Sequence, residues 1–389
     1  GFWVSDISHD SFAMPLKTGL EKVKELEVAV KENLDWNRHC VQGLQDSYSI
    51  AEDLPFSRVL DHDTAEQRPY KSRKGESKTV LHWGQRKLIL AEIEFLTLYY
   101  QKASCVVYAG AAPGTHIAFL AKMFPKLQFD LLDGRPFSRK LEEEAKELKD
   151  ESGQSRIRMR QELFTEELAK DYAKKEGVLF ISDVRASKDD EFHPSQQAVE
   201  EDMKLQMTWH LLMKPLASSF KFRLPWGSGI TPYLQGRIFL PVWGPETTTE
   251  SRLFVETGAD ENAEASSLCN YDNQKYEQQM FYFNTHTRIA KYQHPYLDYF
   301  RCACFDCTSE ASILDAYVRE VGLGHFKDPM DIIKDVPDLS RWLHKECHRD
   351  QENPRTLFHG NPDPVERKRR IQKRQRIDPP KASDSLEHA

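Results

Sequence analysis

The sequence has no long apolar run. None of its stretches approaches the ~18 consecutive apolar residues that a membrane-spanning helix needs. Its first residues also lack the charged-then-apolar pattern of a secretory signal. With 39% hydrophobic residues among 389, the chain can nevertheless bury a sizeable core. We therefore expect a soluble globular protein with no membrane partner.

Cysteines are few and irregularly spaced. The seven cysteines are scattered over the chain instead of forming a compact framework, which favours reduced thiols and a location in the cytosol or nucleus. Cys302, Cys304 and Cys307, with Cys347 and His348 further on, resemble metal-ligand spacing. The Cys-x-Cys-x-x-Cys pattern has no clear second pair, however. We therefore expect buried thiols here and no bound metal.

An excess of basic residues is also missing, yet this does not exclude an RNA partner. The formal charge is -7 over the whole chain, but a total hides how charge is distributed. The run VERKRRIQKRQR, Val365–Arg376, is typical of a nuclear import signal, an RNA contact or a solvated tail. A second basic stretch, RPYKSRKGESK at Arg68–Lys78, is open to interpretation as a phosphate contact or as a disordered loop.

Apolar patterns in the middle of the chain alternate between helical and strand spacing. Strands interleaved with helices of ten or more residues imply β–α–β units, so we predict an α/β fold with a mostly parallel central sheet and helices on both faces. The predicted helices cover residues 85–100, the segment after Gly114, 138–150, 165–175 and 195–214. The predicted strands cover 105–108, the segment ending at Asp133, 178–183, 217–224, 237–242 and 252–256.

The same patterns divide the chain into four parts. Residues 1–82 are predicted to form an extension that is helical at first and then polar and irregular, and residues 83–260 to form the α/β core. Residues 261–347 read as a mainly helical part of the same domain. Residues 348–389 lose apolar periodicity and are predicted to form a basic, disordered tail.

The turn in VVYAGAAPGTHIAFL lacks the middle glycine of the dinucleotide-binding motif Gly-x-Gly-x-x-Gly. Gly110 and Gly114 are separated by Ala-Ala-Pro, so the turn offers no cradle for a pyrophosphate. It suits an uncharged edge, such as the amino acid and ribose of S-adenosylmethionine. Asp133 ends the next strand, where a carboxylate can accept both hydroxyls of an adenosine ribose. The alternative is a generic strand-to-helix turn beside a solvent-facing aspartate.

Four charged residues lie within or next to predicted apolar strands and helices, where a charge is unfavourable unless it has a partner or a function. Asp183 follows a predicted strand, at the edge where ligands bind in open α/β sheets. Lys221 lies inside the apolar strand SSFKFR, where a lysine is unfavourable unless it is paired. Lys87 lies in the apolar helix QRKLILAEIEFL, and Glu250 immediately precedes the strand SRLFVE. Each of them also has an ordinary interpretation as a surface or capping residue.

Several stretches resemble the cap-specific mRNA ribose 2′-O-methyltransferases of the poxvirus type, a branch of the FtsJ-like ribose methyltransferases with kinetoplastid relatives. The resemblance implies a Rossmann-like class I methyltransferase fold, S-adenosylmethionine as methyl donor, S-adenosylhomocysteine as product and no need for a metal. The stretches lie in order between Gly84 and Asn284: GQRKLILAEIEFL, VVYAGAAPGTHIAFL, LLDGR, FISDVRASK, PLASSFKFRLPW, ESRLF and YEQQMFYFN.

The resemblance also implies roles for individual residues. The Lys-Asp-Lys-Glu tetrad of the family matches Lys87, Asp183, Lys221 and Glu250. We predict that Lys221 takes the proton of the ribose 2′-hydroxyl as this oxygen attacks the sulfonium methyl group. Lys87 would lower the pKa of Lys221, while the two carboxylates orient its amine. The implied donor contacts are Gln85, Tyr108, Gly110, Gly114, His116, Asp133, Arg135, Phe164 and Asp183.

Cap recognition in this family stacks the cationic N7-methylguanine between aromatic rings while carboxylates accept its protons. By resemblance, Trp226 is one ring and Glu277 a base-reading carboxylate. Where the family has a second acid, this chain has GSGI, so Ser228 or no residue takes that role. The candidates for the second ring are Trp36, Phe56 and Tyr70.

The predicted activity is therefore methylation of the 2′-hydroxyl of an early transcribed nucleotide in capped mRNA or small capped RNA. The expected location is the nucleus, or the cytoplasm for a viral protein. One alternative is a ribose methyltransferase acting on internal rRNA or tRNA nucleotides, which needs no guanine sandwich. Another is a non-catalytic RNA-binding or polymerase-stimulating subunit, because the poxvirus relative also partners a poly(A) polymerase. A partner from the capping or polyadenylation machinery is consistent with each interpretation.

Overall fold

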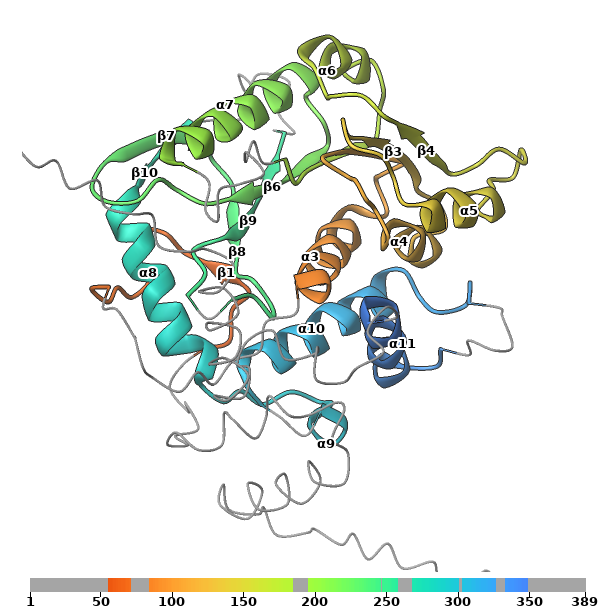
Figure 1. Cartoon of the computed structure of the whole chain (residues 1–389). Helices are drawn as coiled ribbons and strands as arrows, with labels where there is room; N and C mark the ends of the chain where they lie inside the picture. Colours follow the sequence, from red (N-terminus) through yellow and green to blue (C-terminus); the bar gives the residue numbers. More distant parts are fainter. Residues whose placement is uncertain are drawn as a thin grey trace, which may run out of the picture.

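A computed structural model of the chain describes residues 55–70, 84–184, 195–245, 247–257, 268–300, 303–326 and 333–348. Within these ranges, helices lie on both faces of an eight-stranded sheet (Figure 1). None of the helices described in these ranges is long and apolar enough to cross a membrane. The predictions for residues 1–54 and for the tail beyond residue 348, including Trp36 and the basic run, lie outside the described residues.

The central sheet is mostly parallel, as the sequence predicted. Five neighbouring strands, β6-β5-β2-β3-β4, pair in parallel, and β9, β8 and β1 extend the sheet beyond β6 in antiparallel pairings. A two-stranded antiparallel ribbon pairs β7 with β10. The strands are β1 (Val59–Leu60), β2 (Cys105–Ala109), β3 (Gln128–Leu132), β4 (Ile157–Arg160), β5 (Val178–Ser182), β6 (Ala217–Phe222), β7 (Ile230–Leu234), β8 (Arg237–Phe239), β9 (Ser251–Glu256) and β10 (Leu268–Asp272).

Several helices begin at the capping residues that their sequences provide. Ser138, Thr165, Ser195 and Asp272 each accept a backbone N–H of the first turn with their side chains, which satisfies a donor that the helix itself leaves free. The helices are α3 (Gly84–Tyr99), α4 (Ile117–Met123), α5 (Arg139–Glu147), α6 (Glu166–Tyr172), α7 (Gln196–Met213), α8 (Asn273–Thr285), α9 (Leu297–Phe300), α10 (Phe305–Glu320) and α11 (Val336–His348), with a 3₁₀ turn at Thr287–Ile289.

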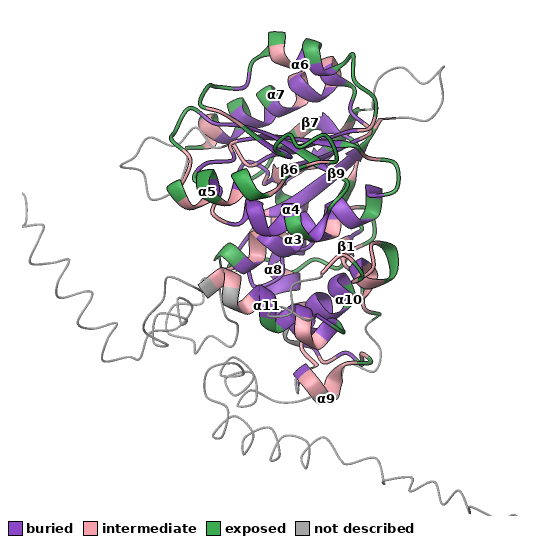
Figure 2. Ribbon diagram, turned by 90° about the vertical axis from the view of Figure 1, so that its right-hand side faces the viewer, coloured by how far each residue is buried: buried purple, intermediate pink, exposed green. Residues whose placement is uncertain are grey.

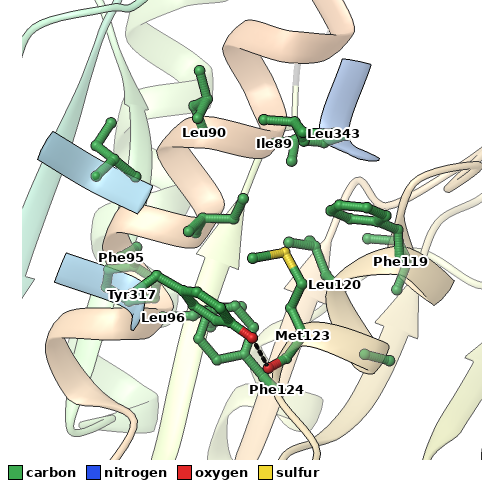
Figure 3. Packing of buried hydrophobic residues seen from close by; sticks show 14 of the residues in the cluster. Ile89, Leu90, Phe95, Leu96, Phe119, Leu120, Met123, Phe124, Tyr317 and Leu343 are labelled. Carbon is green, nitrogen blue, oxygen red and sulfur yellow. Dashed lines mark hydrogen bonds between the residues drawn. The ribbon is translucent and has the colours of Figure 1, made fainter. Parts of the chain in front are cut away.

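The core lies in two layers, one on each face of the sheet. Successive residues of β2 alternate between them, because side chains of a strand point to opposite faces in turn. Figure 2 shows α6 and α7 on one side of the sheet and α3 and α4 on the other. On the α3 side, Leu90 and Leu96 pack with Leu120 of α4 and with Phe124 just after it, and α10 joins them (Figure 3). The Tyr317 hydroxyl of α10 donates to the Met123 carbonyl at 2.6 Å.

Some elements differ from the prediction. β1, β4, β7 and β10 were not predicted, and the strand predicted for 237–242 is shorter, ending at Phe239. Residues 55–70 were predicted to belong to a helical and irregular extension, but Val59–Leu60 adds an edge strand to the sheet. The part predicted as mainly helical, 261–347, begins with β10 and is helical after it. These differences lie toward the sheet's edges and in the ribbon, so the predicted mostly parallel centre of the sheet is unaffected.

Candidate active site

The order in which strands are added to the sheet switches sides at β2, whose neighbours are β3 and β5. From β2 the chain continues to β3 and β4 on one side, while β5 and β6 lie on the other. The loops leaving these strands are tied together: the Gly110 N–H donates to the Leu132 carbonyl at 2.9 Å, and the Asp183 N–H donates to the Ala109 carbonyl at 3.1 Å. Such a switch point at the carboxyl edge is where open α/β sheets bind ligands.

Gly110 is required at this point for two physical reasons. Its φ is +79°, a conformation that residues with a side chain rarely adopt. A Cβ placed on Gly110 would also lie only 3.0 Å from the backbone nitrogen of Val184. The β2 and β5 loops can therefore approach each other closely only because residue 110 has no side chain.

The structure brings the four predicted tetrad residues together as two ion pairs. Lys87, in the first turn of α3, places its Nζ 2.6 Å from Oε1 of Glu250, just before β9. Lys221, within β6, places its Nζ 3.0 Å from Oδ1 of Asp183, just after β5. All four side chains are mostly buried and keep some exposure to solvent. Residues from four elements, α3, β5, β6 and the segment before β9, thus converge on one small cluster of charges.

A fifth charged residue, Arg252, belongs to the same cluster and was missed by the sequence analysis. In the antiparallel pairing of β6 with β9, Arg252 stands opposite Lys221. Its Nη1 lies 2.8 Å from Oδ1 of Asp183, the oxygen that Lys221 also contacts. Arg252 could have been identified by the same criterion as Lys221, because it too is a charged residue inside an apolar strand.

The charges of this cluster determine the ionisation of Asp183. Burial raises the pKa of the Asp183 carboxyl and Glu250 raises it further, but the cations of Lys221 and Arg252 outweigh both and lower it to about 2. Burial lowers the pKa of Arg252, yet Asp183 and Glu250 together raise it. Asp183 is therefore a carboxylate and Arg252 a cation throughout the neutral range.

Asp133, which the sequence analysis predicted to contact a ribose, lies at the carboxyl end of β3. Its Oδ2 accepts the Ala112 N–H at 2.9 Å, and its Oδ1 accepts the Arg135 N–H at 2.9 Å. The Arg135 guanidinium reaches the same carboxylate and the Ala112 carbonyl, while its side chain is largely exposed. Burial raises the pKa of Asp133, but these hydrogen bonds outweigh it and lower the pKa. The carboxylate is thus ionised and fixed between the two glycine-containing loops.

Two other predicted donor contacts, Tyr108 and His116, meet at a buried carboxylate. The Tyr108 hydroxyl donates to Oε1 of Glu92 at 2.7 Å, and His116 Nε2 lies 3.0 Å from Oε2. Glu92 belongs to α3, so the turn after β2 is anchored to the helix that also carries Lys87. Gly114, with φ +66°, lies between these two residues in sequence. Gln85 lies exposed in the first turn of α3.

Phe164, predicted to flank the adenine, is buried between α6 and the sheet. Its ring stacks on Phe180 at 5.2 Å and meets Trp209 edge-on at 5.1 Å. The preceding residue, Leu163, is 73% exposed and close to Gly134, because a Cβ on that glycine would lie 3.0 Å from Leu163 Cδ2. Leu163 is therefore the apolar side chain that faces outward next to Asp133.

These residues fit the predicted methyl donor. An ionised Asp133 suits ribose hydroxyls, and Leu163 offers an apolar surface beside the carboxylate. Among the described residues, no group of three or more histidine, cysteine, aspartate or glutamate side chains could hold a metal ion. Cys304 immediately precedes α10, Cys307 lies in its first turn and Cys347 lies in α11, whereas Cys302 and the His348 side chain lie outside the described part.

Of the predicted cap-binding residues, Trp226 presents its ring to solvent. The side chain is 44% exposed, and the Arg223 guanidinium lies over the ring, 4.7 Å from its centroid. The Trp226 N–H donates to Oε1 of Gln196 at 2.8 Å, which fixes the loop to the start of α7. Ser228, two residues further along this loop, is exposed.

Glu277 lies on α8, next to the Trp226 loop. The Asn273 N–H at the start of α8 donates to the Gly229 carbonyl at 2.9 Å, so the loop and the helix meet there. Glu277 follows Asn273 by about one turn of α8 and is half-buried.

The structure distinguishes two of the candidates for the second aromatic ring of the cap site, Tyr70 and Phe56. Tyr70 is 54% exposed and packs edge-on against Phe281, which lies one turn beyond Glu277 on α8. Phe56 instead packs into the core against Tyr292 and Phe305. Tyr70 is thus the described candidate whose ring is accessible beside the helix of Glu277.

Known proteins resemble this chain over most of its length. A family model described as "Poly A polymerase regulatory subunit" matches residues 54–312. The cap-specific mRNA (nucleoside-2′-O-)-methyltransferase of Fowlpox virus (strain NVSL) is 33% identical over 262 residues, covering 64% of this chain and 81% of that protein. The protein of the same name from Myxoma virus (strain Lausanne) is 30% identical over 250 residues, covering 60% of this chain and 70% of that protein.

A similarity to a solved structure is weaker. Bluetongue virus VP4, described as a multifunctional RNA-capping production line, matches with 14% sequence identity and a TM-score of 0.39, covering 66% of this chain and 43% of that chain. A similarity of this size carries no argument about the site.

Proposed function

Because the chain belongs to the poly(A) polymerase regulatory subunit family, whose matching relatives are poxvirus cap-specific mRNA (nucleoside-2′-O-)-methyltransferases, we propose that it methylates the ribose 2′-hydroxyl of an early nucleotide in capped RNA. The observation that carries this proposal is the convergence of Lys87, Asp183, Lys221 and Glu250 at the carboxyl edge of the sheet. These residues come from α3, β5, β6 and the segment before β9, so their meeting is a property of the fold.

Lys221 is the proposed base. A ribose hydroxyl is a weak nucleophile at neutral pH, so its proton must leave as the oxygen attacks, and an amine positioned beside it can accept that proton. Asp183 orients the Lys221 amine, and Arg252 draws part of the negative charge of Asp183 away from the ammonium form of Lys221. The cluster thereby holds the Lys221 amine in place.

S-adenosylmethionine, when bound, supplies the methyl group already activated on a sulfonium. The proposed donor site uses Asp133 for the ribose hydroxyls and the turn at Gly110–Gly114 for the amino-acid end. Its position beside Asp183 places the donor next to Lys221, so much of the acceleration would come from orientation of the two reactants. Arg135 would help to keep the Asp133 carboxylate in place.

We further propose that Trp226 and Tyr70 stack on the methylated guanine, with Glu277 accepting protons from its edge. N7-methylguanine carries a positive charge, which strengthens stacking on aromatic faces and hydrogen bonds to carboxylates. The Arg223 cation already occupies one face of the Trp226 ring, which indicates that this ring favours a cationic partner. Where the family has a second acid, Ser228 or no residue of this chain takes that role.

The experiment that tests this function compares short RNAs that differ only in their 5′ end. Radiolabelled methyl transfer from S-adenosylmethionine is measured on N7-methylguanosine-capped, unmethylated-capped and triphosphate RNA, and nuclease digestion locates the labelled ribose. We expect strong preference for the methylated cap and label on one early nucleotide. Equal labelling of all three RNAs would instead favour a methyltransferase of internal rRNA or tRNA nucleotides.

The family description favours a second candidate function, stimulation of a poly(A) polymerase. No labelling of any RNA together with normal donor binding would favour this role as a non-catalytic subunit.

A nuclear location is proposed from the basic run at Val365–Arg376. Replacing its lysines and arginines by glutamine in a fluorescent fusion should then abolish nuclear accumulation.

A further inference from the structure

Helix α10 carries two fully buried carboxylates one turn apart, Asp306 and Glu310. Each is paired with a fully buried arginine from another element. Arg288, in the 3₁₀ turn after α8, places its Nε 3.0 Å from Oδ2 of Asp306. Arg86, in α3, donates to both oxygens of Glu310, with Nε at 2.7 Å from Oε2. The two pairs lie outside the tetrad and have no place in the mechanism above.

The Glu310 pair acts on the helix that carries Lys87. Arg86 immediately precedes Lys87 in the first turn of α3, so the direction of this turn depends on where Arg86 is held. From α11, the Ser340 hydroxyl donates to Oε1 of Glu310 at 2.6 Å, and His344 Nδ1 lies 3.2 Å from Nη1 of Arg86. The start of α3 is therefore fixed from two C-terminal helices.

The Asp306 pair acts on the segment that leads to Glu250. The Trp243 backbone N–H donates to Oδ1 of Asp306 at 2.9 Å, and its indole N–H donates to Oε2 of Glu310 at 2.8 Å. Trp243 has a φ of +56°, a left-handed conformation that an aromatic residue adopts only when its surroundings hold it there. The backbone N–H and the indole N–H of Trp243 thus both donate to carboxylates of α10.

Further hydrogen bonds fix the residues between Trp243 and Glu250 to neighbouring elements. Arg288 donates to the carbonyls of Gly244 at 2.7 Å and Pro245 at 3.0 Å. The Asn284 side-chain amide donates to the Thr248 carbonyl at 2.8 Å, and the Glu250 N–H donates to Oγ1 of Thr248 at 3.0 Å. The segment from Trp243 to Glu250 is therefore anchored to α8, the 3₁₀ turn and α10.

We propose that Asp306 and Glu310 form a positioning clamp that brings Lys87 and Glu250 into register, a role that rests on the proposed function of the tetrad. One carboxylate holds the start of α3, the other holds the segment before β9, and Trp243 bridges the two. The Lys87–Glu250 ion pair at 2.6 Å closes the same loop of contacts on the side of the active site.

Stability alone does not account for this arrangement. Desolvating two arginines and two carboxylates is unfavourable, and well-packed apolar residues of similar volume often replace such pairs with no loss of stability or with a gain. What the ion pairs provide, and apolar residues do not, is a fixed direction for each partner. Because the two buried ion pairs lie between the segments that supply Lys87 and Glu250, the fixed geometry of these pairs also fixes the positions of Lys87 and Glu250.

The test replaces the pair with apolar residues of similar length, Arg86→Met together with Glu310→Met. The matched control is Tyr317→Phe, which removes a buried hydrogen bond from the same helix at a site that faces α4. We expect kcat on capped RNA to fall about tenfold or more in the double variant, with the KM for RNA and the Kd for S-adenosylhomocysteine within about twofold of wild type. An unchanged kcat in the folded double variant would overturn the proposal.

Hydrogen exchange supplies a readout that does not depend on activity. We expect faster exchange at residues 84–88 and 247–251 in the double variant than in Tyr317→Phe, because both segments lose their common anchor. Equal exchange in the two variants would refute the clamp. Should the wild-type protein transfer no methyl group, the proposed function fails and the exchange result alone decides on the clamp. If the double variant does not fold, Trp243→Phe decides by the same readouts. This substitution removes the indole N–H bond to Glu310 together with part of the buried ring, and it keeps the backbone N–H bond to Asp306.

Discussion

The Nη1 of Arg252 lies 2.8 Å from Oδ1 of Asp183, the carboxylate oxygen that Lys221 Nζ approaches to 3.0 Å. Two cations therefore share one anion at the carboxyl edge of β5. This sharing fixes the geometry around Lys221 while dividing the negative charge that would otherwise stabilise its ammonium form. The consequences can be measured in variants of either partner.

Replacing Arg252 with glutamine should slow catalysis and destabilise the fold. Asp183 would then be balanced by Lys221 alone, so Lys221 would hold its proton more firmly and the acid limb of the kcat profile would move to higher pH. The charged residues of the cluster that remain in this variant are Lys221, Asp183, Lys87 and Glu250. Loss of a buried charge-assisted contact should lower the unfolding free energy by about 1–3 kcal/mol. Urea unfolding measures this, with Arg139→Gln, at an exposed pair, expected to show no measurable change.

Replacing Asp133 with alanine should weaken donor binding. The variant loses the carboxylate proposed to accept the ribose hydroxyls, and charge-assisted hydrogen bonds of this kind correspond to about a 10- to 100-fold change in Kd. Calorimetric titration with S-adenosylhomocysteine measures it. Asp130→Asn, at the buried carboxylate of the same strand that accepts the Tyr172 hydroxyl, is the matched control and should bind normally. Equal affinities for both variants would argue against the assigned ribose contact.

Removing either proposed stacking ring should raise the KM for capped RNA while leaving donor affinity unchanged. We expect Trp226→Ala and Tyr70→Ala to raise it by about 3- to 30-fold, because a cation–π contact contributes roughly 0.5–2 kcal/mol. Tyr70→Phe keeps the ring and should behave like wild type. Leu205→Ala removes another exposed apolar side chain, from α7, and should have no effect. A normal KM for Tyr70→Ala would exclude it as the second ring.

The buried His210 should make the fold less stable in mild acid. Its Nδ1 lies 2.7 Å from the Ser218 hydroxyl, and burial lowers the pKa of His210 from 6.5 to about 4. Between these values the unfolded chain binds a proton that the folded chain does not, so stability is complete above about pH 6.5 and falls as the pH approaches 4. The predicted loss at pH 5.5 is about 1–2 kcal/mol.

Urea unfolding at pH 7.5 and 5.5 measures this loss. Burial also lowers the pKa of His62 and His325, so they act in the same direction, and the difference between wild type and His210→Gln isolates His210. The lowered pKa of Asp183 acts in the same direction, but only below about pH 4, outside this window. An identical pH dependence in the variant would contradict the assignment.

Local patterns were sufficient to predict the centre of the fold. The apolar runs of β2, β5 and β6 are buried on both faces, which makes them readable as strands, and Asp183 follows one of them directly. Lys221 could be singled out because a lysine among apolar residues needs a partner. The Lys-Asp-Lys-Glu assignment itself came from the resemblance to a family, and the structure places those residues together.

The parts that were missed depend on contacts between distant segments. Arg252 joins the site only because β9 pairs antiparallel with β6 in one particular register, which the sequence of β9 alone does not fix. β4 reads IRMR, with Arg158 exposed and Arg160 partly exposed at the edge of the sheet, so it lacks an apolar run. The ribbon of β7 and β10 joins segments far apart in the chain. The clamp likewise requires α3, α10 and α11 to be packed together before Arg86 and Glu310 can be seen as partners.

The central claim is that this cluster transfers a methyl group with Lys221 as base. The most direct measurement is single-turnover methyl transfer to N7-methylguanosine-capped RNA by wild type and by Lys221→Ala, with S-adenosylhomocysteine affinity measured on both. We predict label on one early ribose for the wild type, a rate at least ~100-fold lower for the variant, and equal affinities. A near-normal rate in Lys221→Ala, or label that never reaches a ribose of the capped RNA, would contradict the account.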